Sequence, residues 1–315
     1  MTEHRLEGLE PDNLLAFLAL LGLLRALEEA RPGWAPRVRW DVDAPPTRPV
    51  LVLREAATAE AVAAAAAEGV AALARAYDFD RDRFSFVRAE GRALLEAARE
   101  AETPGRADLA SALLSDAAPK SAKKPDEALQ PHPLKLLDVA QTAFFKSLRE
   151  IVAGAPAPGG KRKAKKNATP ASLIGKALFA PWSREDAVSG LRWDPAEDRR
   201  HAYAWKAPTD EGTTSEAGAN RLAAIGFMAL TAVPIIERGA VRLAALGIGR
   251  DEAGDVGVVW PIWRAPASLD AIRALLGHPG LDDPETRRRL GVVERRQARR
   301  VSAGKYMNVT RADVV

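Results

Sequence analysis

The stretch from Leu14 to Leu24 constrains the fold most, because it holds no polar or charged side chain. A helix that is apolar all round needs burial on every side, so it should lie inside the protein rather than on its surface. It is too short to cross a membrane, which takes about 20 apolar residues. We therefore predict a buried helix in the N-terminal half that begins after Pro11, is capped by Asp12 or Asn13, and runs to about Ala30.

Composition sets the outer limits. With 315 residues, 47% of them hydrophobic, the chain can form one large or two ordinary domains. The absence of cysteine excludes disulfides, thiolate metal sites and cysteine nucleophiles. Acidic residues at Glu3, Glu7 and Glu10 precede the apolar stretch and argue against a secretory signal, so we expect a cytoplasmic protein with no membrane partner.

The pattern of strands and helices indicates an α+β fold in two parts. Residues 1–153 should form a small N-terminal sheet with a helical bundle, and residues 171–315 a second α+β half closed by a basic β-hairpin. Between them, at 154–170, proline and glycine precede a run of lysine and arginine that cannot pack into a core, which is typical of an exposed linker or loop.

Individual elements follow from periodicity, propensity and turn residues. The expected strands are 5–9, 38–42, 50–53, two pieces of 191–205 around Pro195, 240–246, 256–263, and the closing pair 292–301 and 306–310. The expected helices are 13–30, 58–76, 91–101, 108–114, 134–152, 171–178, 218–232 ended by Pro234, and 268–276.

One group of carboxylates has the residue types of a metal site. Asp78, Asp80 and Asp82 alternate along the chain and could supply oxygen ligands to Mg²⁺ or Ca²⁺. The calcium-loop template also needs a glycine at its sixth position and a glutamate at its twelfth, and neither is present when counting begins at Asp78. Arg81 and Arg83 lie among the acids, so a solvated turn is the favoured interpretation.

Other motifs of catalysis do not emerge. The four histidines are scattered, without the spacing of zinc ligands. The sequence has no Gly-X-Ser-X-Gly elbow, no dinucleotide fingerprint after a strand, and no phosphate loop in register. We therefore expect a protein that is not an enzyme and that needs no cofactor.

The C-terminal tail is strongly basic. From residue 285 onward, nine basic residues stand against Glu285, Glu294 and Asp313, which leaves about +6, more than the formal +4 of the whole chain. If 292–301 is a strand, Arg295 and Arg299 point one way and Arg296 and Arg300 the other, so one pair is available for phosphates while the other pairs with acids.

These patterns predict a nucleic-acid site, with the alternative that an arginine-rich tail is merely a soluble surface. The lysine-rich run at 161–166 would add a salt-sensitive electrostatic arm. Tyr306 could stack on a base, although a lone aromatic is more often packed. Asn220 and Arg221 could contact a base or phosphate at a helix start, although an internal cap or ion pair is favoured for them. The candidate residues are Lys161, Arg162, Lys163, Lys165, Lys166, Asn220, Arg221, Arg295, Arg296, Arg299, Arg300, Lys305 and Tyr306.

Three pieces of the sequence together carry a family resemblance: residues 8–25, residues 191–203 followed by 218–222, and residues 299–308. They resemble proteins of the type I-G (formerly I-U) CRISPR systems, and are most similar to the subunits encoded beside the backbone and crRNA-processing proteins. The match covers both ends and the middle of the chain, but not the helical and basic segments between them.

The resemblance implies a component of a crRNA-guided, DNA-targeting complex of antiviral defence, in a large-subunit-like or accessory role. The chain is short for a large subunit. Its partners would be crRNA, target DNA, other effector subunits and the helicase-nuclease. In guided systems base pairing reads the sequence while protein subunits contact the backbone. The leading hypothesis is thus a non-catalytic nucleic-acid-binding subunit, the second a structural adaptor that binds only protein, and the third a metal-dependent nuclease using Asp78, Asp80 and Asp82.

Overall fold

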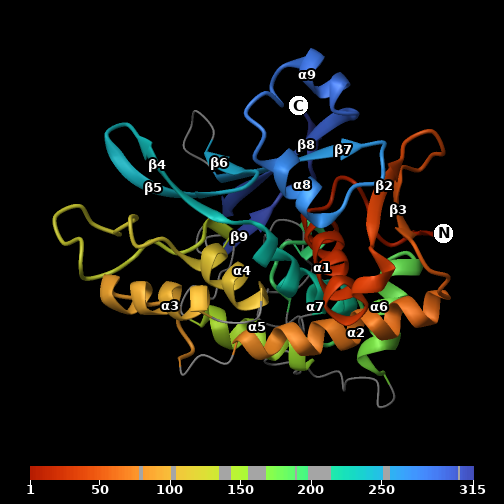
Figure 1. The fold of residues 1–315 in the computed structure, drawn as a ribbon, viewed down its shortest axis with the longest axis horizontal. Coiled ribbons are helices and arrows are strands. Elements are labelled where there is room, and N and C mark those ends of the chain that lie inside the picture. Colours follow the sequence, from red (N-terminus) through yellow and green to blue (C-terminus); the bar gives the residue numbers. More distant parts are fainter. Residues whose placement is uncertain are drawn as a thin grey trace.

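The computed structural model describes residues 1–77, 81–100, 104–134, 143–154, 168–188, 190–197, 214–250, 256–303 and 306–315. The fold is mixed α+β, as the sequence predicts, with a small antiparallel sheet at the N-terminus and a larger antiparallel sheet in the C-terminal half. Most of the helices lie below the two sheets in the view of Figure 1, while α8 and α9 lie beside and above the C-terminal sheet.

The helices agree with most of the expected ranges. Several begin at side chains that cap their free N–H groups: the Asn13 side chain accepts from the Ala16 N–H, Thr58 from Ala61 and Thr169 from Ser172. The helices are α1 (Leu14–Ala30), α2 (Ala59–Ala74), α3 (Arg88–Glu100), α4 (Pro104–Leu113), α5 (Phe144–Ala153), α6 (Pro170–Phe179), α7 (Ala217–Gly226), α8 (Leu269–Leu276) and α9 (Pro284–Arg289).

The N-terminal sheet has the order β1-β3-β2 and is antiparallel throughout. The hairpin of β2 and β3 confirms the prediction for this region, while β1 lies three residues before the strand expected at 5–9. Arg5 at the end of β1 contacts Asp41 of β2 with a 2.5 Å ion pair. The strands are β1 (Thr2–Arg5), β2 (Arg37–Asp41) and β3 (Arg48–Leu53).

The C-terminal sheet has the order β10-β8-β7-β6-β5-β4, with β9 paired to the far end of β8. The predicted closing hairpin is confirmed, since Arg300 to Ala303 pair with Val309 to Tyr306. The strands are β4 (Ala232–Glu237), β5 (Ala240–Ala245), β6 (Ile248–Arg250), β7 (Val256–Trp263), β8 (Val292–Ala303), β9 (Tyr306–Val309) and β10 (Asp313–Val314).

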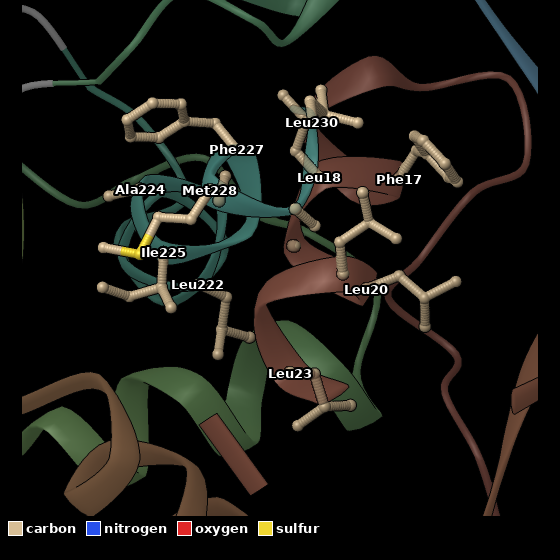
Figure 2. Packing of buried hydrophobic residues seen from close by; sticks show 14 of the residues in the cluster. Phe17, Leu18, Leu20, Leu23, Leu222, Ala224, Ile225, Phe227, Met228 and Leu230 are labelled. Carbon is tan, nitrogen blue, oxygen red and sulfur yellow. The ribbon is translucent and has the colours of Figure 1, made fainter. Parts of the chain in front are cut away.

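Helix α1 is buried as predicted, but its position is more central than expected. All but four of its residues are buried, and it packs chiefly against α7 and α2. Figure 2 shows leucines of α1 facing the apolar side chains of α7 and of the 3₁₀ turn that follows it. On another side Phe17 stacks on Trp260 of β7, with ring centroids 5.2 Å apart. The helix is therefore the centre of both halves, and not the spine of the N-terminal half alone.

The two sheets are also joined directly. The Val38 N–H donates to the Ala267 carbonyl at 2.9 Å, and the Ala267 N–H donates back to Val38 at 2.8 Å. The Trp263 indole N–H donates to the Val38 carbonyl at 2.8 Å. One apolar core holds residues from 6 to 312, on both sides of the boundary predicted at 154–170, of which residues 155–167 lie outside the described residues.

Two local predictions were wrong. Residues 191–194 form no strand, because they pack instead against the start of α1 and lead into a 3₁₀ turn at Pro195–Glu197; residues 198–205 lie outside the described part of the chain. Helix α7 ends at Gly226 and not near residue 232, and Pro234 lies in β4. Proline is tolerated there because β4 is an edge strand, where a missing N–H breaks no ladder bond.

Within the ranges that the structure covers, no helix combines the length and the apolar character that crossing a membrane requires.

Candidate nucleic-acid interface

Strand β8 places the tail arginines on two opposite faces of the C-terminal sheet, as alternation along a strand requires. Arg296 pairs across the ladder with Trp260, whose side chain is fully buried, so Arg296 lies on the inner face that packs on α1. Arg295 pairs with Pro261 on the opposite, outer face, and Gln297 pairs with Val259 there. The outer face thus carries Arg295, Gln297 and Arg299, which we call the outer-face row.

Arg295 is the most enclosed member of this row. Its side chain is 16% exposed, and its guanidinium contacts the carboxylate of Asp282, a residue on the turn before α9. The Asp282 side chain is 86% exposed, so water screens most of this ion pair. The buried Nε–H of Arg295 has no hydrogen-bond partner among the described residues. An arginine held this way keeps donors available for a further acceptor.

Arg299 is exposed and lies at the open part of the row. Its Nη2 donates to the Gln297 side-chain oxygen at 3.4 Å, which is a contact with an uncharged group. Beside it, Gly257 of β7 pairs with Arg299 and with Gly249 of β6. A Cβ built on Gly249 would meet no atom of the described residues within 4 Å, so in this part of the chain the sheet surface beside the row is open to a ligand.

The inner-face arginines are engaged by the protein itself. Arg296 binds Glu294 on the same face at 2.6 Å through Nη2 and at 2.7 Å through Nε. Arg300 is half-buried and pairs across the ladder with buried Val309. The two faces are as strand alternation predicts, but the acids are not confined to one of them, because Arg295 on the outer face also pairs with an acid, Asp282.

The remaining basic residues of the tail differ in their engagement. Arg311 binds Asp12 at 2.8 Å and Glu10 at 3.0 Å, and these hydrogen bonds raise its pKa above the ordinary value. Arg311 therefore fastens the C-terminal tail to the N-terminal segment. On α9, Arg288 and Arg289 are exposed and have no acidic partner within the described ranges. These two arginines add positive charge near the N-terminal end of β8, which follows α9 in the chain.

Asn220 and Arg221 both lie in the interior, where an internal role was favoured. The Asn220 side chain is fully buried, accepts from the Leu191 N–H at 2.8 Å and donates to the Glu216 carbonyl at 3.1 Å. The Arg221 guanidinium donates to the Val152 carbonyl, and burial lowers its pKa. Neither side chain is presented to a ligand at the surface.

Two of the pieces of sequence that carry the resemblance, residues 8–25 and 191–203, meet at the start of α1. The Asn13 side chain donates to Asp194 at 3.0 Å, and the Leu15 N–H donates to the Trp193 carbonyl at 3.1 Å. The Asp194 carboxylate also accepts from Arg184 at 2.6 Å. These polar groups satisfy one another in the core, so their physical role is to lock α1 to the loop before α7.

Several predicted site residues cannot be placed. Lys161, Arg162, Lys163, Lys165, Lys166 and Lys305 lie outside the described residues, as does the side chain of Tyr306, the first residue of β9. Asp78 and Asp80 of the predicted metal site also lie outside them.

Asp82 of that site is described, and its carboxylate contacts Arg149 of α5. In the described part of the chain, no three histidine or acidic side chains gather in a way that would hold a metal ion.

Some residues of the interface were missed by sequence reasoning. Gln297 could have been predicted from the sequence, because it lies between Arg295 and Arg299 on the same face of a predicted strand. Gly249 and Gly257 were not, because their place beside the row depends on how β6 and β7 pair. No protein-family model and no curated protein sequence matches this chain.

Proposed function

We propose that this protein is a non-catalytic nucleic-acid-binding subunit of a crRNA-guided, DNA-targeting complex. Its outer-face row would hold the sugar–phosphate backbone of a nucleic-acid strand. The observation that carries the proposal is that Arg295 and Arg299 lie on the same outer face of β8, and that the ladder neighbours of the exposed Arg299 are Gly257 and Gly249. The part of the proposal that assigns the protein to a CRISPR system is supported by the sequence resemblance.

A sheet face of this kind suits a nucleic-acid strand for two physical reasons. Arginine guanidinium groups bind phosphate oxygens and release counterions, which gives affinity without sequence preference. A flat surface next to them leaves room for the strand, and at Gly249 no side chain occupies it. Arg288 and Arg289 of α9 would extend the positive potential beyond the row.

The test is binding of single-stranded and double-stranded oligonucleotides across a salt titration. In the double variant Arg295→Ala/Arg299→Ala, the slope of log K against log salt should fall by about 1.4 for a single strand, because each lost phosphate contact removes about 0.7. Affinity near 0.1 M salt should fall about 25-fold.

The matched control removes two arginines from surface ion pairs elsewhere. Arg31 pairs with Glu68 at 2.8 Å and Arg264 with Asp43 at 2.6 Å, both exposed. The variant Arg31→Ala/Arg264→Ala changes the net charge by the same amount and should keep the wild-type slope. Equal slopes in all three proteins would refute the proposed interface.

A second candidate function, that of a protein adaptor, is favoured by the β4–β5 hairpin. This hairpin projects from the body of the protein (Figure 1) and turns at Arg238 and Gly239, both with positive φ. It exposes four large apolar side chains to solvent, where polar residues would be expected on a hairpin without a partner: Val233, Ile235, Ile236 and Val241. Of these, Ile236 is 83% exposed. Exposed apolar patches of this kind mark sites of protein contact.

The two candidates separate in one experiment. The protein is affinity-purified from its native host as wild type, as Arg295→Ala/Arg299→Ala and as Ile236→Ser, and the co-purifying RNA and proteins are identified. Loss of RNA in the arginine variant alone supports the proposed function. A wild type that retains proteins but no RNA, with the proteins lost in Ile236→Ser, supports the adaptor.

A further inference from the structure

A pocket of about 320 Å³ opens on the outer face of the C-terminal sheet, at the Arg295 end of the row. The C-terminal sheet forms its floor, with Gly247 and Gly249 at β6, Val259 and Pro261 on β7, and Arg295 on β8. Its roof is the end of α8 and the turn that follows, from Leu276 to Asp282. The volume is at the lower end of the range for small-molecule sites, so it suits one small ligand or one unit of a polymer.

The roof is fixed by a series of local hydrogen bonds. The His278 N–H donates to the Leu275 carbonyl at 3.1 Å, and the Leu281 N–H donates to the His278 carbonyl at 3.3 Å. Leu281 is buried and anchors the turn to the core. The ion pair between Asp282 and Arg295 then ties this turn to β8. The pocket is thus largely formed before any ligand binds.

The polar groups of the pocket are two donors and one acceptor. The Gly280 N–H donates to His278 Nδ1 at 3.1 Å, so in the neutral ring the proton lies on Nε2, which becomes a donor. Arg295 lines the pocket and supplies guanidinium N–H groups beyond the one that Asp282 holds. The Asp282 carboxylate is the acceptor. Leu276, Pro279 and Pro261 give the apolar walls.

We infer that this pocket holds a single nucleotide, with the base between the apolar walls and a phosphate on Arg295 and His278. A planar base fills an apolar slot, a phosphate accepts from both donors, and the base N–H groups can donate to Asp282. Because Arg295 belongs to both the row and the pocket, a strand lying along the row delivers one unstacked nucleotide into it. The inference rests on the proposed function and adds the site that receives a base.

The test uses a variant that fills the pocket without removing charge. Gly249 lines the pocket, and a Cβ there meets nothing within 4 Å, so Gly249→Phe adds a side chain into open space. Gly249→Leu is the milder second variant. Val293→Phe is the matched control, because Val293 is 41% exposed on β8 and does not line the pocket.

The probes are single-stranded oligonucleotides that each carry 2-aminopurine at a different position, and 2-aminopurine nucleoside monophosphate alone. Unstacking of the base raises its fluorescence, so at one position the wild type and Val293→Phe should give a several-fold increase on binding. Both Gly249 variants should lose this increase. Because Gly249 also borders the row, the oligonucleotide binding that remains in these variants should keep the salt dependence that Arg295 and Arg299 contribute. Binding of the monophosphate to the wild type but not to the Gly249 variants would place a free nucleotide in the same pocket.

The outcomes keep the two proposals apart. The pocket does not receive a base if the oligonucleotides bind but 2-aminopurine fluorescence rises at no position, or if Gly249→Phe gives the same fluorescence increase as the wild type. The proposal of the outer-face row is unaffected by either result. If no oligonucleotide binds the wild type, both proposals are overturned.

Discussion

Gly22 of α1 and Gly226 of α7 meet where the two helices cross. A Cβ on Gly22 would lie 1.8 Å from the Leu222 carbonyl oxygen, and a Cβ on Gly226 would lie 1.9 Å from the Leu18 carbonyl oxygen. Each glycine thus admits the backbone of the other helix. This reciprocal contact sets the distance between α1 and α7 and joins residues that are about 200 positions apart in the chain.

Replacing Gly22 by alanine should therefore destabilise the protein. Alanine favours a helix over glycine by about 1 kcal/mol, but a methyl group against a backbone carbonyl cannot be relieved by a side-chain rotation, so we expect a net loss of about 2 kcal/mol. Chemical denaturation followed by circular dichroism measures the change. Gly249→Ala, which meets no neighbour, should stay close to the wild type, and a stable Gly22→Ala would show that the helices are not held at this distance.

Replacing Asp194 should lower the stability of the protein more than replacing most other polar residues. Its carboxylate is 2% exposed and accepts from Asn13, from Arg184 and from the Ala196 N–H. Asp194→Ala leaves the fully buried Asn13 amide without its acceptor and the half-buried Arg184 without its counter-charge, so we expect a loss of about 3 kcal/mol. Thermal and denaturant unfolding report it. Asp82→Ala, which removes an exposed ion pair with Arg149, should cost less than about 1 kcal/mol and serves as the comparison.

Glu28 should make stability fall as the pH rises. Burial raises its pKa from the ordinary 4.5 to about 7, against the opposing effect of Arg25 and with further raising by Asp270 and Asp108. Between these two values the folded state binds the proton more tightly than the unfolded state, so the contribution is present at low pH and is lost as the pH passes about 7. Glu28→Gln should remove this slope, as urea unfolding at a series of pH values would measure.

His132 should act in the opposite direction. It is fully buried, its Nε2 donates to the Leu230 carbonyl, and burial lowers its pKa from 6.5 to about 4. The unfolded state binds more protons in that interval, so stability is present above pH 6.5 and falls as the pH drops towards 4. His132→Gln should flatten this part of the profile. If the unfolding stability of both Glu28→Gln and His132→Gln depends on pH as that of the wild type does, the burial of these two groups is wrongly assigned.

Asp313 offers a gain-of-affinity test of the outer-face row. It lies opposite Gln297 on β10 and places a carboxylate beside the row. If a phosphate backbone lies there, Asp313→Asn should tighten oligonucleotide binding and steepen its salt dependence, because a repulsive charge has gone. Glu68→Gln, on α2 beside Arg31, changes the charge equally and is the control. Weaker binding by Asp313→Asn would contradict the placement of the strand.

Gln130 should matter for the motion of the hairpin and not for overall stability. Its amide donates to the Val241 carbonyl at 2.9 Å and accepts from the Leu243 N–H at 3.1 Å, as a neighbouring strand would. Gln130→Ala exposes that edge of β5, so amide exchange at Leu243 should accelerate while the melting temperature stays within a few degrees. Unchanged exchange at Leu243 would mean that the hairpin is held by its base alone.

The local pattern determined much of the fold. Capping residues, apolar periodicity and helix propensity placed α1, α2, α6 and α8, and β-prone runs placed β7 and the closing hairpin. Strand alternation gave the two faces of β8, because all these features depend on neighbours in sequence. Prediction failed at residues 191–194, where β-prone residues serve a buried loop, and at Pro234, which is tolerated only because β4 is an edge.

Tertiary structure decided what the sequence left open. The apolar stretch from Leu14 to Leu24 required burial, but which surfaces would bury it depended on contacts with α7 and β7, about 200 residues away or more. Arg295 and Arg299 were expected on one face, but Gly249, His278 and Asp282 join them only through strand pairing and the turn after α8. The physical reason is that periodicity reports which side of an element faces inward, whereas the partner on that side is chosen by packing across the whole chain.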